Sequence, residues 1–259
     1  MKIKGNGLQI GYGDSIVIDE IDIEICKNEI TTIIGPNGSG KSTVLKAITR
    51  LLNYKKGIVN IDGRDLKSFG AKEFSRRIGV LPQIHTAPAD FMVKELVSYG
   101  RMPYQHFLSG RTAEDERIIK EAMEATGTYH LRDKSIHELS GGESQRVWIA
   151  TVLSQQPEIL FLDEPTTYLD ISHQIETMRM VKKLNRTTGM GVVMVLHDLS
   201  HALEVSDRII VIKDGKKYSE GTPTEVITQQ MLRDVYHVDA DIVHLEGRSK
   251  PLIAFRELA

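Results

Sequence analysis

Gly35–Thr43 reads GPNGSGKST, and the rest of the chain can be arranged around this stretch. An apolar segment at 30–34 precedes it and another at 44–48 follows it, so we expect a strand, a glycine-rich turn and a helix. The glycines let successive backbone N–H groups face one point, toward which the helix directs the positive end of its dipole. Lys41 can then reach terminal phosphates, and the Ser42 hydroxyl can bind Mg²⁺. The stretch predicts nucleotide binding, but alone it does not distinguish a kinase, a GTPase, an ATPase motor and a switch.

Composition sets wide limits on the class of protein. A chain of 259 residues fits one large or two small domains, and 26% charged with 41% apolar residues is ordinary. The net charge of −2 gives no general attraction to nucleic acid or anionic lipid, so we expect any membrane attachment to use a protein partner. No window approaches eighteen apolar residues and no signal-peptide core follows Met1, so we expect a cytosolic or peripheral chain. Cys26 is the only cysteine, which excludes an internal disulfide.

The segment before the glycine-rich turn alternates with period two from Gly7 to Ile25, which predicts antiparallel strands. Tyr12 lies between two glycines there, where its ring could stack on a purine base or could be a turn residue with no ligand. Further strands are expected at 57–61 and 78–81. The second of these ends at Gln83, which by itself is an ordinary loop residue.

From about 90 to 155 the pattern becomes helical. Thr112 precedes an acidic first turn, and apolar residues recur on one face until Gly127 ends the run. We therefore predict an all-helical insert between two parts of an α/β core. The stretch Gly100–Tyr104, reading GRMPY, interrupts these helices and could be a plain connector.

LSGGE at Leu139–Glu143 opens the last helix of this region. Free N–H groups, a serine hydroxyl and a helix dipole make it a second possible anion-binding surface. In isolation, the simpler interpretation is a serine N-cap followed by a glycine turn.

Two buried strands end in polar side chains. The run at 159–162 is followed by Asp163, which could hold Mg²⁺ through water, and by Glu164, which could polarise an attacking water. The run at 191–196 ends in His197, at the edge of the sheet where ligands bind in open α/β folds. A further strand is expected at 208–212, and the tail after Gly221 shows no motif.

Taken together, these features resemble the nucleotide-binding subunit of an ABC transporter over nearly the whole chain. The matching motifs, in family terms, are Walker A (GPNGSGKST), the Q-loop (Gln83), the signature (LSGGE), Walker B (ILFLDEP), the D-loop (TYLD), the H-switch (His197) and the A-loop (Tyr12). Two departures are Glu143, where glutamine is commoner, and Thr167-Tyr168, where serine and alanine are usual. These departures leave open the rate of ATP hydrolysis and the fine contact across a dimer.

The resemblance implies roles for particular residues. The implied catalytic residues are Glu164, His197, Lys41 and Gln83, and the implied Mg²⁺ ligands are Ser42, Gln83 and Asp163. The residues implied to contact ATP are Tyr12, Gly35, Pro36, Asn37, Gly38, Ser39, Gly40, Lys41, Ser42, Thr43, Ser140, Gly141, Gly142 and Glu143.

The resemblance also implies an architecture and partners. We expect an α/β fold: a P-loop NTPase (RecA-like) core with an antiparallel β subdomain and an inserted α-helical subdomain. Residues 1–259 would form a single ABC ATPase domain, with 1–85 and 156–259 as the core and 86–155 as the helical signature subdomain. The expected partners are a second copy with ATP, transmembrane permease subunits and, indirectly, an extracytoplasmic binding protein, with no nucleic acid. Such a subunit is peripheral, on the cytoplasmic side of the cell membrane.

A finer resemblance is to importers of ferric siderophores, haem and cobalamin, through GRMPY, DEPTTYLD and VLHDLSHAL. The expected function is the ATP-hydrolysing subunit of an iron-siderophore importer. The alternatives are an importer for haem, cobalamin or another substrate, a soluble ABC switch of translation or DNA repair, and an export ATPase. A single cassette with no coiled-coil insert, no basic face and no transmembrane half counts against the last two.

Overall fold

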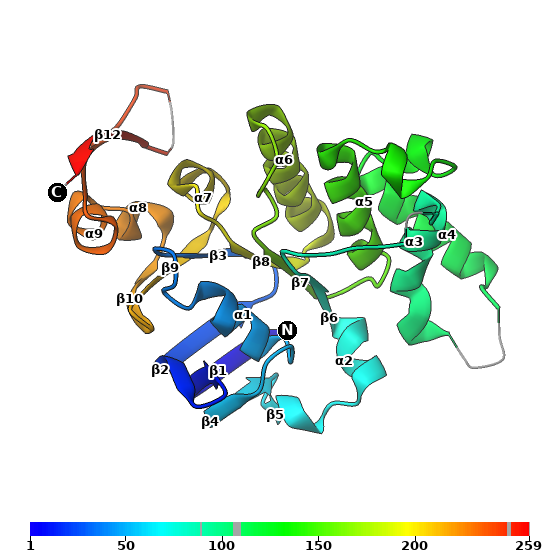
Figure 1. Cartoon of the computed structure of the whole chain (residues 1–259), viewed down its shortest axis with the longest axis horizontal. Helices are drawn as coiled ribbons and strands as arrows, with labels where there is room; N and C mark the ends of the chain where they lie inside the picture. Colours follow the sequence, from blue (N-terminus) through cyan, green and yellow to red (C-terminus); the bar gives the residue numbers. More distant parts are fainter. Residues whose placement is uncertain (89, 106–109, 248–249, 259) are drawn as a thin grey trace. The chain divides into compact units, whose positions relative to one another are not determined.

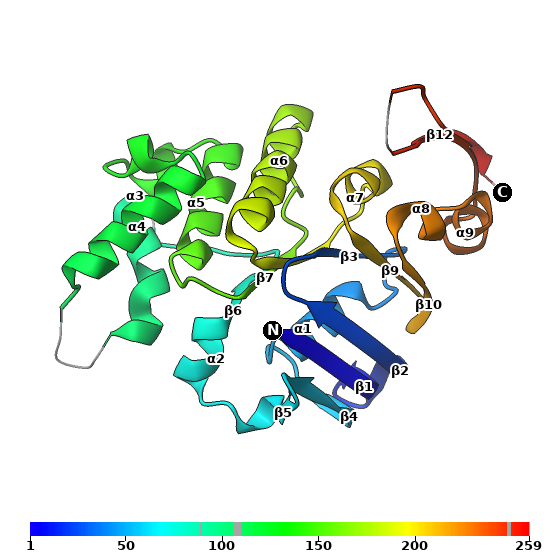
Figure 2. The ribbon, with the colours of Figure 1, turned by 180° about the vertical axis from the view of Figure 1, so that it is seen from behind.

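The computed structural model describes residues 1–88, 90–105, 110–247 and 250–258. The chain forms two compact units, Met1–Leu66 with Val193–Ala259 and Lys67–Val192, whose helices and strands are labelled in Figure 1 and seen from behind in Figure 2. The boundary at 192/193 lies within strand β8 (Gly191–Val195). The expected helical subdomain, 86–155, lies in the second unit's range, and its exact limits stay a prediction.

The first unit contains a four-stranded antiparallel sheet with the strand order β2-β1-β4-β5. Its strands are β1 (Lys2–Tyr12), β2 (Ser15–Cys26), β4 (Tyr54–Ile61) and β5 (Arg64–Asp65). In β2, alternate side chains are buried, among them Ile21, Ile23 and Ile25. This alternation is what a sheet with one covered face requires, and it confirms the predicted antiparallel β subdomain.

The glycine-rich loop of this unit follows a strand that is buried on both faces. β3 (Ile30–Ile34) pairs in parallel with β9 (Arg208–Lys213), which pairs antiparallel with β10 (Lys216–Gly221). Helices α1 (Lys41–Ile48) and α7 (Leu199–Val205) come after β3 and β8 in the chain. The loops before both helices therefore begin at the carboxyl ends of strands, where open α/β sheets bind ligands.

The tail, in which the sequence shows no motif, is ordered into short elements. They are α8 (Pro223–Val226), α9 (Gln229–Met231), a π-helix (Leu232–Tyr236) and the antiparallel strands β11 (Val238–Val243) and β12 (Leu252–Leu258). The Lys250 ammonium group donates hydrogen bonds to the carbonyls of Glu204 and Ser206, both at 3.0 Å. These bonds attach the tail to α7.

The second unit is built from helices and two parallel strands, β6 (Ile78–Leu81) and β7 (Ile159–Asp163). Its helices are α2 (Ala71–Arg77), α3 (Val93–Ser98), α4 (Ala113–Ala125), α5 (Gly141–Leu153) and α6 (Ile171–Thr188), with 3₁₀ turns at Tyr99–Tyr104, Tyr129–Leu131 and Ile136–Glu138. Apolar side chains of α3, α4 and α5 form one core, which includes Val97, Ile119 and Val147. The predicted helical insert is thus confirmed.

Buried Arg101 makes the GRMPY stretch a structural junction rather than a plain connector. Arg101 is only 4% exposed, and its Nε donates a hydrogen bond to Asp115 Oδ1 at 2.9 Å. One Nη of Arg101 donates to the carbonyl of Ser154 at 2.8 Å, and the guanidinium lies over the Tyr104 ring. The charge is thus buried with a carboxylate, a carbonyl and an aromatic face as partners, as a buried cation requires. The motif ties α4 and the end of α5 to the 3₁₀ turn that contains it.

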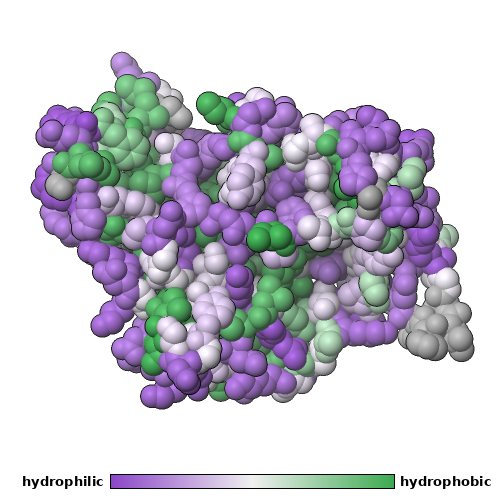
Figure 3. All heavy atoms as spheres, in the orientation of Figure 1, coloured by the Kyte–Doolittle hydropathy of each residue, from purple (hydrophilic) through white to green (hydrophobic). Residues whose placement is uncertain are grey.

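Hydrophilic side chains cover most of the face drawn in Figure 3, with smaller apolar patches between them. In the described part of the chain, none of the helices combines the length and the apolarity needed to cross a membrane. Among the large apolar side chains exposed on the second unit are Ile84, Met102, Tyr168 and Ile171.

Candidate nucleotide site

The loop at Gly35–Thr43 has a backbone that glycine adopts most readily. Gly38 and Gly40 have φ angles of 77° and 102°, in the left-handed region. A Cβ added at Gly40 would collide with Ile18 of strand β2, whereas one added at Gly38 would meet no atom of the described residues within 4 Å. The loop therefore packs closely against β2 at Gly40 and has open space at Gly38.

Three features of this loop fit a bound phosphate. The Lys41 ammonium group is buried and donates hydrogen bonds to the carbonyls of Gly35 and Pro36, at 3.0 and 2.9 Å. The Ser39 hydroxyl is buried and has no hydrogen-bond partner among the described residues. Among the described residues, no side chain caps the N-terminus of α1. Buried polar groups and helix N-termini need partners, and an anion in the loop would supply them.

Two other predicted residues lie in the first unit. Tyr12 ends β1, and its side chain is 48% exposed, so its ring is accessible for stacking. His197 is exposed and lies just before α7, whose N-cap Asp198 accepts hydrogen bonds from the amides of Ser200 and His201. His197 lines a cavity of about 320 Å³ together with tail residues that include Tyr236.

In the second unit the predicted glutamine and glutamate meet. Gln83 Nε2 donates a hydrogen bond to Glu164 Oε2 at 2.6 Å, and the Thr167 hydroxyl donates to the same oxygen at 3.0 Å. Glu164 has a φ of 54°, a conformation uncommon for residues other than glycine and frequent at functional sites. Asp163, at the end of β7, is buried. Two donors on one oxygen fix the direction of the Glu164 carboxylate.

The contact between Thr167 and Glu164 was missed by the sequence prediction, which treated Thr167 only as a departure from the family pattern. A hydroxyl three residues after an acidic residue in a turn is the signal that could have indicated it.

The signature begins with a complete capping box. The Ser140 hydroxyl accepts a hydrogen bond from the Glu143 amide at 3.3 Å, and the Glu143 carboxylate accepts one from the Ser140 amide at 2.8 Å. The Ser140 backbone N–H holds the pKa of the Glu143 carboxyl below its usual value. The unusual Glu143 thus stabilises the first turn of α5, and it carries a negative charge there.

The predicted site residues are divided between the two units. Residues 35–43, Tyr12 and His197 belong to the first, and Gln83, Asp163, Glu164 and 140–143 belong to the second. The structure brings together Gln83 with Glu164, and Ser140 with Glu143. Within the described ranges, no group of three or more His, Cys, Asp or Glu side chains could hold a metal. A site with few carboxylates suits Mg²⁺, which usually takes its remaining ligands from substrate phosphates and water.

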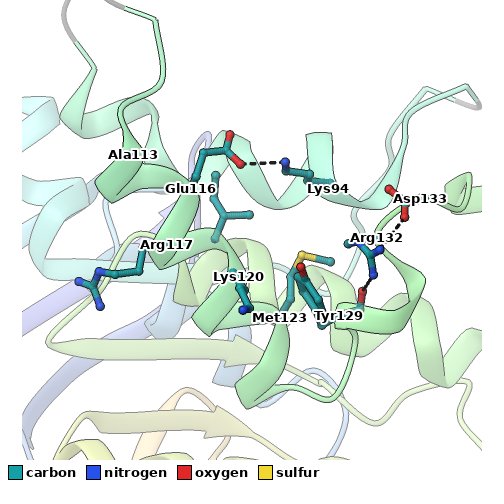
Figure 4. A pocket seen from close by; sticks show the side chains of 10 residues that line it. Lys94, Ala113, Glu116, Arg117, Lys120, Met123, Tyr129, Arg132 and Asp133 are labelled. Atoms are coloured by element: carbon teal, nitrogen blue, oxygen red, sulfur yellow. Dashed lines mark hydrogen bonds and ion pairs between the residues drawn. The ribbon is translucent and has the colours of Figure 1, made fainter.

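A separate pocket of about 450 Å³ lies in the helical part of the second unit, and no predicted site residue lines it (Figure 4). Its four basic side chains are each paired with a carboxylate. The pairs are Lys94–Glu116, Arg117–Glu114, Lys120–Glu124 and Arg132–Asp133. The pocket therefore offers little unbalanced charge to an anion, and we do not assign it to the nucleotide.

Residues 18–167 match the family model described as ABC transporter. The chain belongs to the ABC transporter family. ABC ATP-binding proteins are ATPases, so the expected fold, the nucleotide ATP and the ATPase activity are confirmed at the level of the family.

Two relatives match this ABC protein over almost its whole length. The iron(3+)-hydroxamate import ATP-binding protein of Bacillus subtilis (strain 168) is 44% identical over 245 residues, covering 95% of this chain and 91% of that protein. The ferric enterobactin transport ATP-binding protein of Escherichia coli (strain K12) is 41% identical over 252 residues, covering 97% and 93%.

Among solved structures, the dimeric structure of a bacterial ABC transporter cassette superposes with a TM-score of 0.73 at 29% identity, covering 85% of this chain and 98% of that one. A post-hydrolysis state of the same cassette, bound to ADP and phosphate, superposes with a TM-score of 0.72. ABC cassettes of this kind dimerise and hydrolyse ATP.

Proposed function

We propose that this chain is the ATP-hydrolysing subunit of an importer that takes up an iron-siderophore complex. The observation that carries the proposal is the identity above 40% with two relatives named for ferric hydroxamate and ferric enterobactin, each aligned over more than 90% of both chains. Haem and cobalamin are the alternative cargoes, because the sequence marks that indicate iron chelates also occur with them.

The first unit would bind the nucleotide. The Tyr12 ring stacks on adenine, and the backbone of residues 35–43 surrounds the phosphates. Lys41 would exchange its hydrogen bonds to the carbonyls of Gly35 and Pro36 for contacts with the terminal phosphates. The phosphates would also give the buried Ser39 hydroxyl a hydrogen-bond partner.

The metal would be bound by few protein groups. Ser42, Asp163 and Gln83 are the proposed ligands, a hydroxyl, a carboxylate and an amide oxygen of the type Mg²⁺ prefers. Bound Mg²⁺ would neutralise charge on the phosphate oxygens. Gln83 donates its amide nitrogen to Glu164, so its amide oxygen remains for the metal.

The second unit would supply the general base. Glu164 orients the attacking water and accepts its proton, while Gln83 and Thr167 hold the carboxylate. His197 contacts the terminal phosphate from the first unit.

A second copy of the chain would complete each site. The signature residues 140–143 of one copy close over the ATP in the loop of the other, in a two-fold arrangement with two equivalent sites. The exposed Tyr168 and Ile171 follow Walker B and would lie in this interface.

The dimer would bind two permease subunits on the cytoplasmic side of the membrane, and through them act with an extracytoplasmic binding protein and without nucleic acid. Ile84 and Met102 are apolar and exposed on the second unit, and Ile84 follows Gln83 directly. They fit a peripheral subunit that docks on a membrane partner.

Uptake of labelled cargo tests this function. Cells that lack the chain should lose energy-dependent uptake of radioactive iron supplied as a hydroxamate or catecholate chelate, and should keep cobalamin uptake. Normal uptake of every iron chelate, with loss of haem or cobalamin uptake, would assign the cargo to the alternative.

Gln83→Ala should impair transport more than it impairs ATP binding. The variant loses the bond to Glu164, whereas the groups of the first unit that bind ATP are unchanged. We expect transport to fall about tenfold while ATP affinity changes by less than about twofold, since Gln83 would transmit a movement to the permease. Uptake by reconstituted vesicles and equilibrium ATP binding measure the two effects. Gln229→Ala, on the exposed tail, is the matched control, and an equal loss of both properties would show that Gln83 is only a nucleotide ligand.

A further inference from the structure

The second glycine of the signature lies directly under a histidine of the same chain. A Cβ added at Gly142 would lie 2.5 Å from Cγ and 2.7 Å from Nε2 of the His173 ring, so no larger residue fits there. Of the described residues, a Cβ added at Gly141 would meet only Leu169, at an ordinary distance of 3.8 Å. Packing within this chain therefore requires glycine at 142 but not at 141.

The histidine ring is held in one orientation by Asp170. The Asp170 carboxylate caps α6 and accepts hydrogen bonds from the His173 amide at 2.9 Å and the Ser172 hydroxyl at 2.8 Å. These bonds lower the pKa of Asp170 to about 2, and the bond from the His173 backbone amide has the largest effect. Because Asp170 is a carboxylate at neutral pH, the 2.8 Å contact to Nδ1 means that Nδ1 carries the proton and donates it.

Other contacts join the same two segments. Helices α5 and α6 lie side by side in both views (Figures 1 and 2). Arg146 of α5 forms an ion pair with Glu176 of α6 at 3.0 Å. Gln174 Nε2 donates to the Leu169 carbonyl at 2.9 Å and fastens the D-loop to the first turn of α6. The D-loop and the signature of one chain thus form a single packed surface.

We propose that His173 is a positioning residue for the signature: its ring, fixed by Asp170, seats the first turn of α5 so that Ser140 and Gly141 face the nucleotide held by a second copy. The inference rests on the proposed function, because it assumes that the signature completes a partner's site. It assigns different tasks to the two glycines. Gly142 admits the His173 ring, and Gly141 leaves room for the phosphate.

A double-mutant cycle tests this assignment. His173→Ala removes the ring and should lower kcat about tenfold, since a displacement of about 1 Å in a positioned group can cost up to about 100-fold. ATP binding to the P-loop of separated chains should stay unchanged. Gly142→Ala should lower kcat about 100-fold, because its methyl group collides with the His173 ring. In the double variant the collision is absent, so activity should return to the level of His173→Ala alone.

Two further variants make the result specific. His173→Asn keeps a hydrogen-bond donor near Asp170 and should recover part of the activity, and His130→Ala, an exposed histidine of the same unit, should match the wild type. Circular dichroism and P-loop ATP binding identify any variant that fails to fold. If Gly142→Ala fails to fold, the kcat of His173→Ala alone tests the role of His173.

Wild-type kcat in His173→Ala, or a double variant no better than Gly142→Ala, would overturn the role of His173. Normal hydrolysis by Ser140→Arg would instead show that the signature is not part of the site, which would overturn the proposed dimer and this inference together.

Discussion

Glu164→Gln should bind MgATP with nearly wild-type affinity and hydrolyse it about 10²–10⁴ times more slowly, a loss of roughly 3–5 kcal/mol of barrier lowering. The amide has the shape of the carboxylate and keeps an oxygen that can accept from Gln83 and Thr167, so the local structure should persist. What it loses is the ability to take a proton from water. Single-turnover hydrolysis and equilibrium nucleotide binding measure the two quantities separately.

Glu158→Gln is the matched control. Glu158 lies just before the opposite end of strand β7, where it pairs with Arg77 at 2.6 Å. The same chemical change there should leave turnover unaffected. Hydrolysis by Glu164→Gln within a few-fold of the wild-type rate would contradict the general-base role.

Slow hydrolysis also provides a way to observe the dimer. If ATP lies between two chains, Glu164→Gln should sediment as a dimer with MgATP and mainly as a monomer with MgADP, because the phosphate held by both chains is missing in ADP.

Local patterns predicted most of the elements that hold the candidate site. Strand β6 has the predicted bounds, and the signature motif opens helix α5 with Ser140 as its N-cap, as the serine-cap interpretation expects. Periodicity, caps and glycine turns act over a few residues, so they can be recognised in a single sequence.

Contacts between distant segments were not predictable in this way. The ring of His173 on Gly142 and the Arg101–Asp115 pair depend on how two helices pack and on side-chain rotamers, which no local pattern encodes. The hairpin β11–β12 was missed for a different reason. Strand β11 is half-buried, β12 is mostly exposed, and both carry charged residues, so the period-two pattern of buried strands is weak there.

Mixing two inactive variants should restore hydrolysis. Lys41→Ala removes the P-loop ammonium group and leaves the signature intact. Ser140→Arg leaves the P-loop intact and disables the signature, because the arginine removes the capping hydroxyl and places a bulky cation at the nucleotide surface. In a mixed dimer, the P-loop of the Ser140→Arg chain faces the signature of the Lys41→Ala chain. One complete site results, and the other site carries both defects.

With random pairing, half of the dimers are mixed and each has one working site of two, so we expect about a quarter of wild-type activity if the sites act independently. Steady-state phosphate release from equal mixtures gives the activity, and cross-linking of differently tagged chains gives the fraction of mixed dimers. Replacing the Lys41→Ala chain by the Lys41→Ala/Ser140→Arg double variant is the control, because that pair can form no complete site. If mixed dimers form and hydrolysis stays at the level of this control, the P-loop of one copy and the signature of the other do not act on one ATP. The P-loop and the signature lie on different units of the chain. Recovery of activity would therefore show that a P-loop and a signature from different copies cooperate, and that hydrolysis requires the dimer.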